Sequence, residues 1–431
     1  MFRIIVQKTL EHYVKRYLKK HQIKLVAVVG SVGKTGTKLA VATVLGEKYR
    51  VRSHDGNHNT HLSAPLAILG VQYPDDVHSF AQWRAVFAAA RLRIHSDKDV
   101  DVVVQELGTD KPGDIRAFGR YLKPDIAVVT AVGLEHMEFF KNLEAVAREE
   151  LSVAKFSKLT VVNRDDVDTR FAKFADTHTI DTYGTTDKAE YRIEVEFGIH
   201  LDGVMGRFIT PEWEPIAVNL QLVGDHQVKA AAAAGLVGAR LGLNAQEIAT
   251  GMAKIRPVKG RMNLLRGVNG STIIDDSYNS SPMAVAAALK TVYSLDAPQR
   301  IAILGSMNEF GELSPRAHSA VGELCDPGKL EWLVTVGADA ANYLAPAAQK
   351  KGCQVKTFNT PYEAGGFVHS IIKKDGVVLV KGSQNAIFTE EATKILLHDA
   401  TDEQYLVRQD PEWMAKKQKT FDMMDTSTED V

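Results

Sequence analysis

The chain has 431 residues, 45% of them hydrophobic, and a formal net charge of −1 at neutral pH. Its length exceeds that of one ordinary hydrophobic core, so two or three domains are expected. The balanced charge argues against a nucleic-acid partner, which usually shows as a basic excess. Two cysteines, Cys325 and Cys353, are too few for a disulfide framework or a Cys-based zinc site and are typical of a reducing cytoplasm.

Residues 1–23 predict an amphipathic surface helix. Scattered charges interrupt the apolar pattern and no small-residue cleavage site follows, so the segment does not have the form of a signal peptide. No apolar run in the chain reaches the roughly 18 residues of a membrane span. We therefore expect no stable membrane insertion, although this Lys-rich helix could associate with a membrane surface.

Residues 24–257 predict an α/β domain. Apolar, β-branched runs at 24–30, 100–108, 125–133 and 158–163 alternate with helical patterns, as in a parallel sheet that helices cover on both faces. A more broken stretch, 181–223, predicts an antiparallel excursion before a strongly helical run.

A second α/β domain is expected over 258–408. Pro257 and Gly260 indicate a hinge, after which the strand–helix alternation restarts. Residues 409–431 are polar and are expected to form a frayed tail.

The stretch "VVGSVGKTGTK", residues 28–38, follows a predicted strand and precedes a predicted helix. Gly30 and Gly33 would let backbone N–H groups wrap phosphate groups, and the helix N-terminus adds a favourable dipole. Lys34 would reach the outer phosphates and the Thr35 hydroxyl would hold Mg²⁺. Counted from Gly30, the spacing is one residue shorter than the usual G-x-x-x-x-G-K-[ST], and the alternative interpretation is a tight strand–helix turn.

Glu106 and His136 follow two further predicted strands. Ligands of open parallel sheets bind beyond the carboxyl ends of the strands, where Lys34 and Thr35 also lie. A carboxylate and an imidazole that converge there could hold a divalent ion, although a surface Glu and a loop His are the simpler alternatives. The chain shows neither an N-K-x-D-like guanine reader nor a convincing D-x-x-G, which argues against a GTPase switch.

The chain resembles the Mur ligases over residues 24–395. The shared motifs, in the family's order, are "GSVGKTGTK", "ELGTDKPGDI", "PDIAVVTAVGLEHMEFF", "VVNRDD", "GDHQVKAAAAA", "KGRMN", "IDDSYNSSPMAVAAAL", "LGSMNEFGELS" and "VLVKGS". They are most similar to the MurF type, which joins D-alanyl-D-alanine to a UDP-muramoyl tripeptide. The resemblance implies a central P-loop ATPase domain followed by a Rossmann-like C-terminal domain.

The resemblance also implies ATP- and Mg²⁺-dependent amide formation. A carboxylate would attack the γ-phosphate of ATP, and the incoming amine would attack the resulting acyl phosphate. Charge neutralisation dominates such phosphoryl transfer. By similarity, the catalytic residues are Lys34, Glu106, His136 and Arg261, and the ATP-binding residues are Gly30, Ser31, Gly33, Lys34, Thr35, Gly36, His226, Gln227, Arg261, Asp276, Tyr278 and Asn279.

Metal and substrate residues are implied in the same way. The metal ligands would be Thr35, Glu106 and His136, with Glu150 or a carbamylated Lys155 supplying a further carboxylate, because several relatives carbamylate a lysine in this region. We favour Glu150. Asn57, Asn59 and Asp110 would face the substrate, although the family's "N-x-N-N-E-x-G-x-P" stretch reads "NHNTHLSAPL" here.

The other departure is that the phosphate loop begins at residue 30, so the family's N-terminal UDP-binding domain has no room ahead of it. The sequence therefore predicts a cytoplasmic amide ligase that joins a peptide or muramoyl-peptide carboxylate to an amino acid or dipeptide amine, and a partner chain could supply a UDP site. One alternative is a Mur-family ligase with a non-nucleotide acyl substrate, similar to cyanophycin synthetase or folylpolyglutamate synthetase. The other is a P-loop NTPase that acts as a switch or an inactive scaffold.

Overall fold

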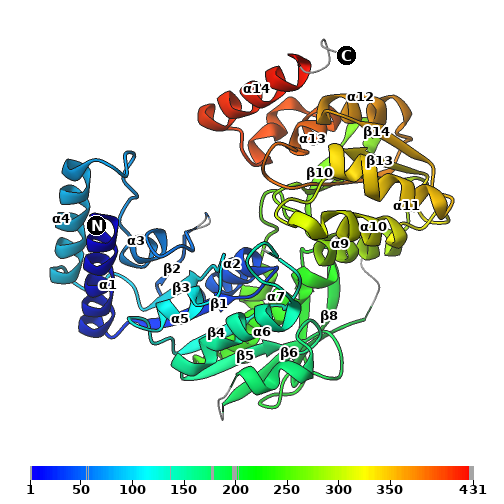
Figure 1. Cartoon of the computed structure of the whole chain (residues 1–431). Helices are drawn as coiled ribbons and strands as arrows, with labels where there is room; N and C mark the ends of the chain where they lie inside the picture. Colours follow the sequence, from blue (N-terminus) through cyan, green and yellow to red (C-terminus); the bar gives the residue numbers. More distant parts are fainter. Residues whose placement is uncertain are drawn as a thin grey trace. The chain divides into compact units, whose positions relative to one another are not determined.

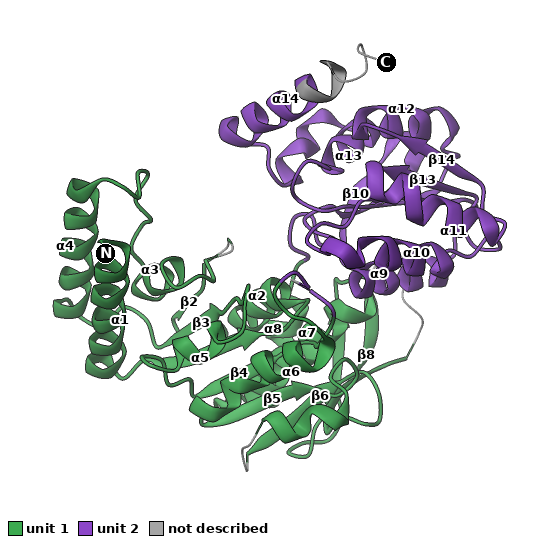
Figure 2. Cartoon of the chain, in the orientation of Figure 1, with its two compact units in different colours: residues 1–133, 139–197, 203–256 green, residues 134–138, 198–202, 257–431 purple. Residues whose placement is uncertain are grey.

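The chain folds into two compact units (Figure 1). The computed structural model describes residues 2–54, 56, 58–135, 137–175, 179–196, 201 and 203–426. Unit 1 comprises 1–133, 139–197 and 203–256, and unit 2 comprises 134–138, 198–202 and 257–431 (Figure 2).

Unit 1 is built on a nine-stranded sheet. Its strands run in the order β2 (Val51–Arg52), β3 (Val102–Glu106), β1 (Lys24–Val29), β4 (Ile126–Val129), β5 (Leu159–Asn163), β6 (Ile180–Gly184), β7 (Tyr191–Val195), β8 (Val204–Ile209) and β9 (Ile216–Leu220). Pairing is parallel from β2 to β7 and antiparallel from β7 to β9. The predicted parallel sheet and the antiparallel excursion are thus both confirmed.

Helices pack on this sheet and along its edge. They are α1 (Phe2–His21), α2 (Lys34–Leu45), α3 (Ser63–Leu69), α4 (Phe80–His95), α5 (Asp114–Phe118), α6 (Leu143–Glu150), α7 (Asp225–Arg240) and α8 (Ala245–Ala253), with short 3-10 helices at Leu151–Phe156 and Thr169–Phe174. Helix α1 buries Val6, Leu10, Val14 and Tyr17 in the unit 1 core. This spacing keeps the apolar side chains on one helical face.

The sheet register brings three strand ends together. Val28 pairs with Glu106 and Val29 pairs with Val129, so β1, β3 and β4 finish at the same edge. The chain continues from these ends into Gly30, Leu107 and Thr130. This edge therefore places the phosphate loop next to Glu106.

Unit 2 holds a six-stranded sheet. Its order is β10 (Asn263–Arg266), β11 (Thr272–Asp276), β15 (Val377–Lys381), β12 (Arg300–Gly305), β13 (Trp332–Val336) and β14 (Val355–Phe358). Only β10 is antiparallel to its neighbour. A second α/β unit with a largely parallel sheet confirms the predicted fold class.

The helices of unit 2 follow the strands in alternation. They are α9 (Pro282–Ser294), α10 (Ser314–Leu324), α11 (Ala345–Lys350), α12 (Pro361–Ile371), α13 (Glu390–Leu396) and α14 (Pro411–Thr426), with short helical turns at Val268–Gly270, Gly311–Leu313, Ala340–Leu344 and Ala400–Tyr405. No helix of the described residues is both long and apolar enough to cross a membrane.

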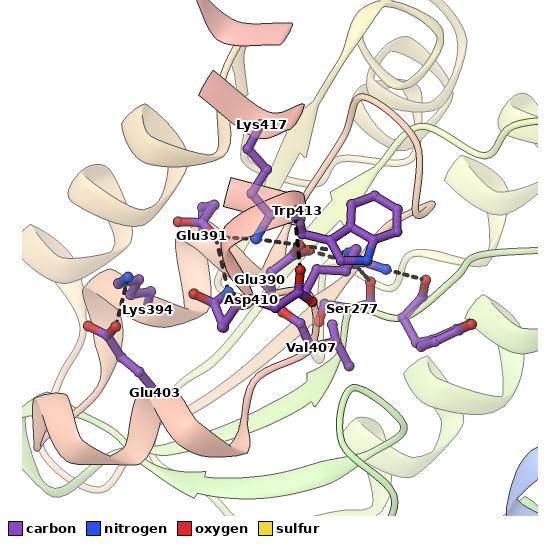
Figure 3. Close-up of polar contacts among 12 residues, drawn as sticks. Ser277, Glu390, Glu391, Lys394, Glu403, Val407, Asp410, Trp413 and Lys417 are labelled. Carbon is purple, nitrogen blue, oxygen red and sulfur yellow. Dashed lines mark hydrogen bonds and ion pairs between the residues drawn. The ribbon is translucent and has the colours of Figure 1, made fainter. Parts of the chain in front are cut away.

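The expected frayed tail is wrong for residues 411–426, which form α14. Its Lys417 side chain is only 1% exposed and pairs with Glu390 and Glu391 of α13 (Figure 3). Phe421 is also buried, with its ring against Tyr362 and Phe388. Long-range ion pairs and ring packing, which a polar composition does not reveal, fix the helix to the unit.

Candidate functional site

The phosphate loop has the backbone that its glycines predict. Gly30 has φ 128° and Gly33 has φ 84°, in the region that side-chain-bearing residues rarely adopt. A Cβ on Gly30 would also lie 2.2 Å from Thr130 Oγ1 and 2.9 Å from the Ala131 backbone nitrogen. Backbone conformation and close packing both require glycine at position 30. A Cβ on Gly36 would meet no atom within 4 Å, so no steric reason of this kind applies there.

Polar contacts from the chain after β4 hold the loop in place. Thr130 Oγ1 donates to the Val32 carbonyl at 2.6 Å. Ser31 Oγ donates to the Gly133 carbonyl at 3.1 Å and accepts from the Gly133 N–H at 2.9 Å. The segment after β4 therefore holds the loop at both Ser31 and Val32.

Lys34 and Thr35 begin α2 directly after this loop. Lys34 Nζ donates to the Gly30 carbonyl at 2.5 Å. Thr35 Oγ1 donates to Glu106 Oε2 at 3.0 Å, and Asn59 Nδ2 donates to Glu106 Oε1 at 3.1 Å. Two residues that the sequence singles out, Thr35 and Asn59, thus contact a third, Glu106, which is 2% exposed.

Lys38 was not predicted from the sequence. It lies one helical turn after Lys34, is 2% exposed, and its Nζ is 3.9 Å from Glu106 Oε2. The same Nζ donates to the carbonyls of His54 and Gly56 at 2.5 and 3.1 Å. Lys38 therefore tethers the loop after β2 and partly neutralises Glu106. Its position on the phosphate-loop helix, four residues after Lys34, is the signal that could have identified it.

Burial lowers the pKa of His58 in the same loop, and the neighbouring charges of His54 and Lys38 lower it further. The two imidazoles stack with their ring centroids 3.6 Å apart. The loop after β2 therefore presents a neutral His58 near neutral pH.

Glu150 and Lys155, the two alternatives for a further carboxylate, have opposite environments. Glu150 ends α6, is 1% exposed, and its Oε2 accepts from the Gly30 N–H at 2.8 Å. Lys155 is exposed in the following 3-10 helix. The structure thus places Glu150, not Lys155, in contact with the phosphate loop.

Two predicted residues, His136 and Asn57, lie outside the described residues. Asp110 follows β3 in an exposed turn, where its N–H donates to Asp114 Oδ2 at 3.1 Å. His226 and Gln227 open α7, a helix that packs against α2. Gln227 Oε1 accepts from the Val223 N–H at 3.1 Å and so closes the turn that leads into α7.

Carboxylate and hydroxyl oxygens are suitable ligands for Mg²⁺, which proteins often bind through one or two carboxylates together with substrate phosphates. Glu106 and Thr35 offer such oxygens beside the phosphate loop. The described residues, which leave out His136, contain no group of three His, Cys, Asp or Glu side chains that could hold a metal ion alone. The donor set therefore fits an ion that nucleotide oxygens help to bind.

In unit 2, Asp276 ends β11 beside Lys381, which ends β15. Lys381 Nζ donates to Asp276 Oδ2 at 2.7 Å and to the Asn279 carbonyl at 2.9 Å, and the lysine is 3% exposed. Lys381 belongs to the "VLVKGS" motif, but no role for it was predicted from the sequence. A lysine at the end of an otherwise apolar strand was the available signal.

Two guanidinium groups lie near the Tyr278 ring. The Arg261 group is 4.2 Å from the ring centroid and the Arg408 group is 5.8 Å from it. Arg408 also donates to the carbonyls of Ser277 and Tyr278 at 2.7 and 3.0 Å. Glu390 holds Arg408 by two hydrogen bonds of 2.7 and 2.6 Å. Arg408, which the sequence did not identify, thus fixes the backbone of the segment that carries Asp276, Tyr278 and Asn279.

Comparison with known proteins identifies the same two regions. Residues 28–238 match the Mur ligase middle domain and residues 260–384 match the Mur ligase, glutamate ligase domain. The UDP-N-acetylmuramoyl-tripeptide–D-alanyl-D-alanine ligase of Bacillus subtilis is 28% identical over 79% of this chain and 68% of its own length.

Solved structures show the same fold. MurF from Acinetobacter baumannii aligns with a TM-score of 0.75 at 23% identity, over 91% of this chain and 81% of that one. The MurF ligase of Thermotoga maritima in complex with ADP aligns with a TM-score of 0.74 at 23% identity, over 90% and 83%. The sequence motifs, the fold and both domain matches agree, and the chain belongs to the Mur ligase family.

Proposed function

We propose that this chain is an ATP- and Mg²⁺-dependent carboxylate–amine ligase of the MurF type. The observation that carries the proposal is the cluster of Lys34, Thr35, Glu106 and Glu150 around a glycine loop at one edge of the unit 1 sheet. The names of the relatives support the same chemistry. D-alanyl-D-alanine and a muramoyl peptide are the proposed substrates in peptidoglycan synthesis, and the proposed location is the cytoplasm.

Lys34, Thr35 and Glu106 each have a defined role in this mechanism, and Glu150 is proposed to supply a further carboxylate at the metal site. The backbone N–H groups of the loop and the Lys34 ammonium stabilise negative charge on the transferred phosphoryl group. Thr35 and Glu106 would hold Mg²⁺, with His136 as the proposed additional ligand, and the ion would supply positive charge that neutralises the phosphate groups. Asn59 and Lys38 keep the Glu106 carboxylate oriented.

The reaction proposed is the transfer of the γ-phosphoryl group to the substrate carboxylate, which releases ADP. The amine then attacks the acyl carbon and expels phosphate. The proposed contacts with the nucleotide are the loop residues 30–36, His226 and Gln227 from unit 1, and Arg261, Asp276, Tyr278 and Asn279 from unit 2. Asn57, Asn59 and Asp110 are the proposed contacts with the acyl substrate.

A phosphate-release assay with ATP and Mg²⁺ tests this function. Purified protein is given UDP-muramoyl tripeptide with D-alanyl-D-alanine, each substrate alone, and glutamate as an alternative amine. We expect phosphate release only when both MurF-type substrates are present, with the amide product visible by mass spectrometry. Turnover that requires another acyl substrate would favour the related-ligase alternative, and hydrolysis without amide formation would favour a non-ligase NTPase.

Recognition of the UDP group is tested by comparing acyl substrates with and without UDP. We propose that the central-domain loops that carry Asn59 and Asp110 recognise mainly the peptide end of the acyl substrate, so that the tripeptide without UDP is used nearly as well. A preference of a hundredfold for the UDP form, about 2.7 kcal/mol, would instead require a nucleotide site, which a partner chain could supply.

A further inference from the structure

Helices α1 and α4 of unit 1 lie side by side and run parallel (Figure 2). The rings of Phe2 and Phe80 are 6.4 Å apart at one end, and those of Tyr13 and Phe87 are 6.1 Å apart further along. At the other end, Lys20 Nζ donates to the Ile94 carbonyl at 2.8 Å. The first turns of both helices therefore lie together.

The exposed faces of the two helices point to the same side of this pair. With about 100° between successive residues, and seen from the N-terminal ends, the exposed face of α1 lies roughly 100° counterclockwise from its contact with α4. The exposed face of α4 lies roughly 100° clockwise from its contact with α1. Both therefore belong to one continuous surface, opposite the face that α1 buries in the core.

This surface combines apolar and basic side chains. Its apolar members are strongly exposed: Ile4 is 63%, Ile5 57%, Phe80 67% and Leu92 69% exposed. Its basic members are also exposed, and they lie on the same helical faces as these apolar side chains. We name as the basic face the set Ile4, Ile5, Lys8, Lys15, Lys19, Phe80, Arg84, Arg91 and Leu92.

Charge on the two helices departs from that of the rest of the chain. Helices α1 and α4 carry nine Lys and Arg residues and one acidic residue, Glu11, in a chain with a net charge of −1. Within the described part of the chain, Lys15, Lys19, Arg84 and Arg91 make no ion pair. Asp75 and Asp76, in the segment before α4, are the acidic residues closest in sequence to Phe80. Their two negative charges do not offset the excess of positive charge on the two helices.

We propose that the basic face binds the surface of an anionic lipid bilayer. Lys and Arg side chains would meet the lipid headgroups, while Ile4, Ile5 and Phe80 would enter the boundary between headgroups and acyl chains. An exposed mixture of this kind marks an interaction site rather than ordinary surface. A nucleic acid would engage the cations alone and leave the exposed isoleucines and leucine without a role, so the lipid surface is the occupant that explains both components.

Sedimentation with vesicles tests the inference. The full chain is mixed with vesicles of phosphatidylcholine alone or with about 30% phosphatidylglycerol. We expect binding to the anionic vesicles only, with release at about 500 mM NaCl, where charge screening is strong. Lys15→Glu/Lys19→Glu should weaken binding at least tenfold, and Ile4→Ser/Phe80→Ser should weaken it similarly without changing the net charge.

A matched control separates this face from total charge. Lys350→Glu/Lys374→Glu makes the same charge change at exposed positions of unit 2 and should bind as the parent does. Equal loss in this control, or no binding of the parent to anionic vesicles, would overturn the proposal. So would a parent dimer that Ile4→Ser/Phe80→Ser converts to monomer, because the face would then bind a second copy of the chain.

Discussion

The Glu150 carboxylate accepts a hydrogen bond from the Gly30 backbone N–H at 2.8 Å, and it is 1% exposed. A buried carboxylate beside a loop that is proposed to bind phosphate would repel the ligand unless a cation stood between them. The contact therefore supports a role for Glu150 near the metal ion. It also gives the loop a carboxylate that needs no chemical modification.

Activity should consequently not depend on carbon dioxide. The parent protein and Lys155→Ala are both expected to keep full turnover in bicarbonate-depleted buffer, because Lys155 is exposed and a Glu150 carboxylate requires no carbamate. Glu150→Ala should lose activity, and added bicarbonate should not restore it. Parent activity that falls on depletion and returns with bicarbonate would instead assign the carboxylate to Lys155.

Glu106→Gln should raise the Mg²⁺ concentration for half-maximal turnover at least tenfold. The amide keeps the size of the side chain but loses the charge that a hard cation needs. Titration of Mg²⁺ in the phosphate-release assay measures the effect. Glu149→Gln is the matched control: Glu149 is also buried, but its oxygens accept from the Gly113 and Ile115 N–H groups at 2.8 and 2.7 Å. An equal Mg²⁺ shift in both variants would refute the specific role of Glu106.

Lys34→Ala should lower kcat by about 10²–10³-fold, the usual effect of losing one preorganised charge-stabilising group. The fold should persist, because Lys34 is not a core residue and its Nζ donates to the Gly30 and Ser31 carbonyls of its own loop. Turnover and circular dichroism together check the prediction. Lys123→Ala removes an exposed lysine of the same unit as a control. Normal turnover by folded Lys34→Ala would exclude the proposed use of ATP.

The strands of the site were predicted well from the sequence, because apolar β-branched runs separated by helical patterns are typical of buried parallel strands. The run at 24–30 became β1, and the glycines after it adopt the positive φ angles that a phosphate loop requires. The proximity of Glu106 and Thr35 was predictable from the sequence, because the carboxyl ends of parallel strands lie at a common edge of the sheet.

Contacts between distant segments could not be predicted in the same way. The positions of Lys38 and Lys381 in the sequence could have drawn attention to them, but the partners of Lys38, Lys381 and Arg408 could not be foreseen. Each is buried with a carboxylate of another element facing it. Helix α14 was missed for the same reason. A periodic pattern shows which face of a helix is apolar. It does not show that a lysine will form an ion pair with a buried carboxylate from a distant part of the chain.

Asp275 should make unit 2 less stable as the pH rises. Burial raises its pKa to about 7 from an ordinary value near 3.8, and the charge of Glu390 adds to the shift. Between these values the folded state holds a proton that the unfolded state has lost, so stability falls with increasing pH across that interval and is level above it.

Asp275→Asn should remove this dependence. The variant should gain on the parent by about 4 kcal/mol between pH 4 and pH 8, since three pKa units correspond to that free energy. Urea unfolding across the pH range measures the difference. Asp296→Asn, at an exposed position of unit 2, is the control. A constant difference between Asp275→Asn and the parent would show that the carboxyl does not titrate in this interval.

Lys417→Met should destabilise unit 2 by about 3–5 kcal/mol, the usual cost of breaking a buried ion pair from one side. Methionine preserves much of the side-chain volume but leaves Glu391, 1% exposed, without the ammonium that now lies 2.5 Å from its Oε1. Glu390 still has Arg408 as a partner, so the loss should fall mainly on Glu391 and on the docking of α14.

Lys416→Met changes the neighbouring residue, which is exposed, and should shift stability by less than about 0.5 kcal/mol. Differential scanning calorimetry of the two variants and the parent measures both effects. Lys417→Arg should recover part of the lost stability. Equal melting of the two methionine variants would mean that the buried carboxylates do not depend on Lys417 and that other contacts, such as the ring packing of Trp413 and Phe421, hold the helix.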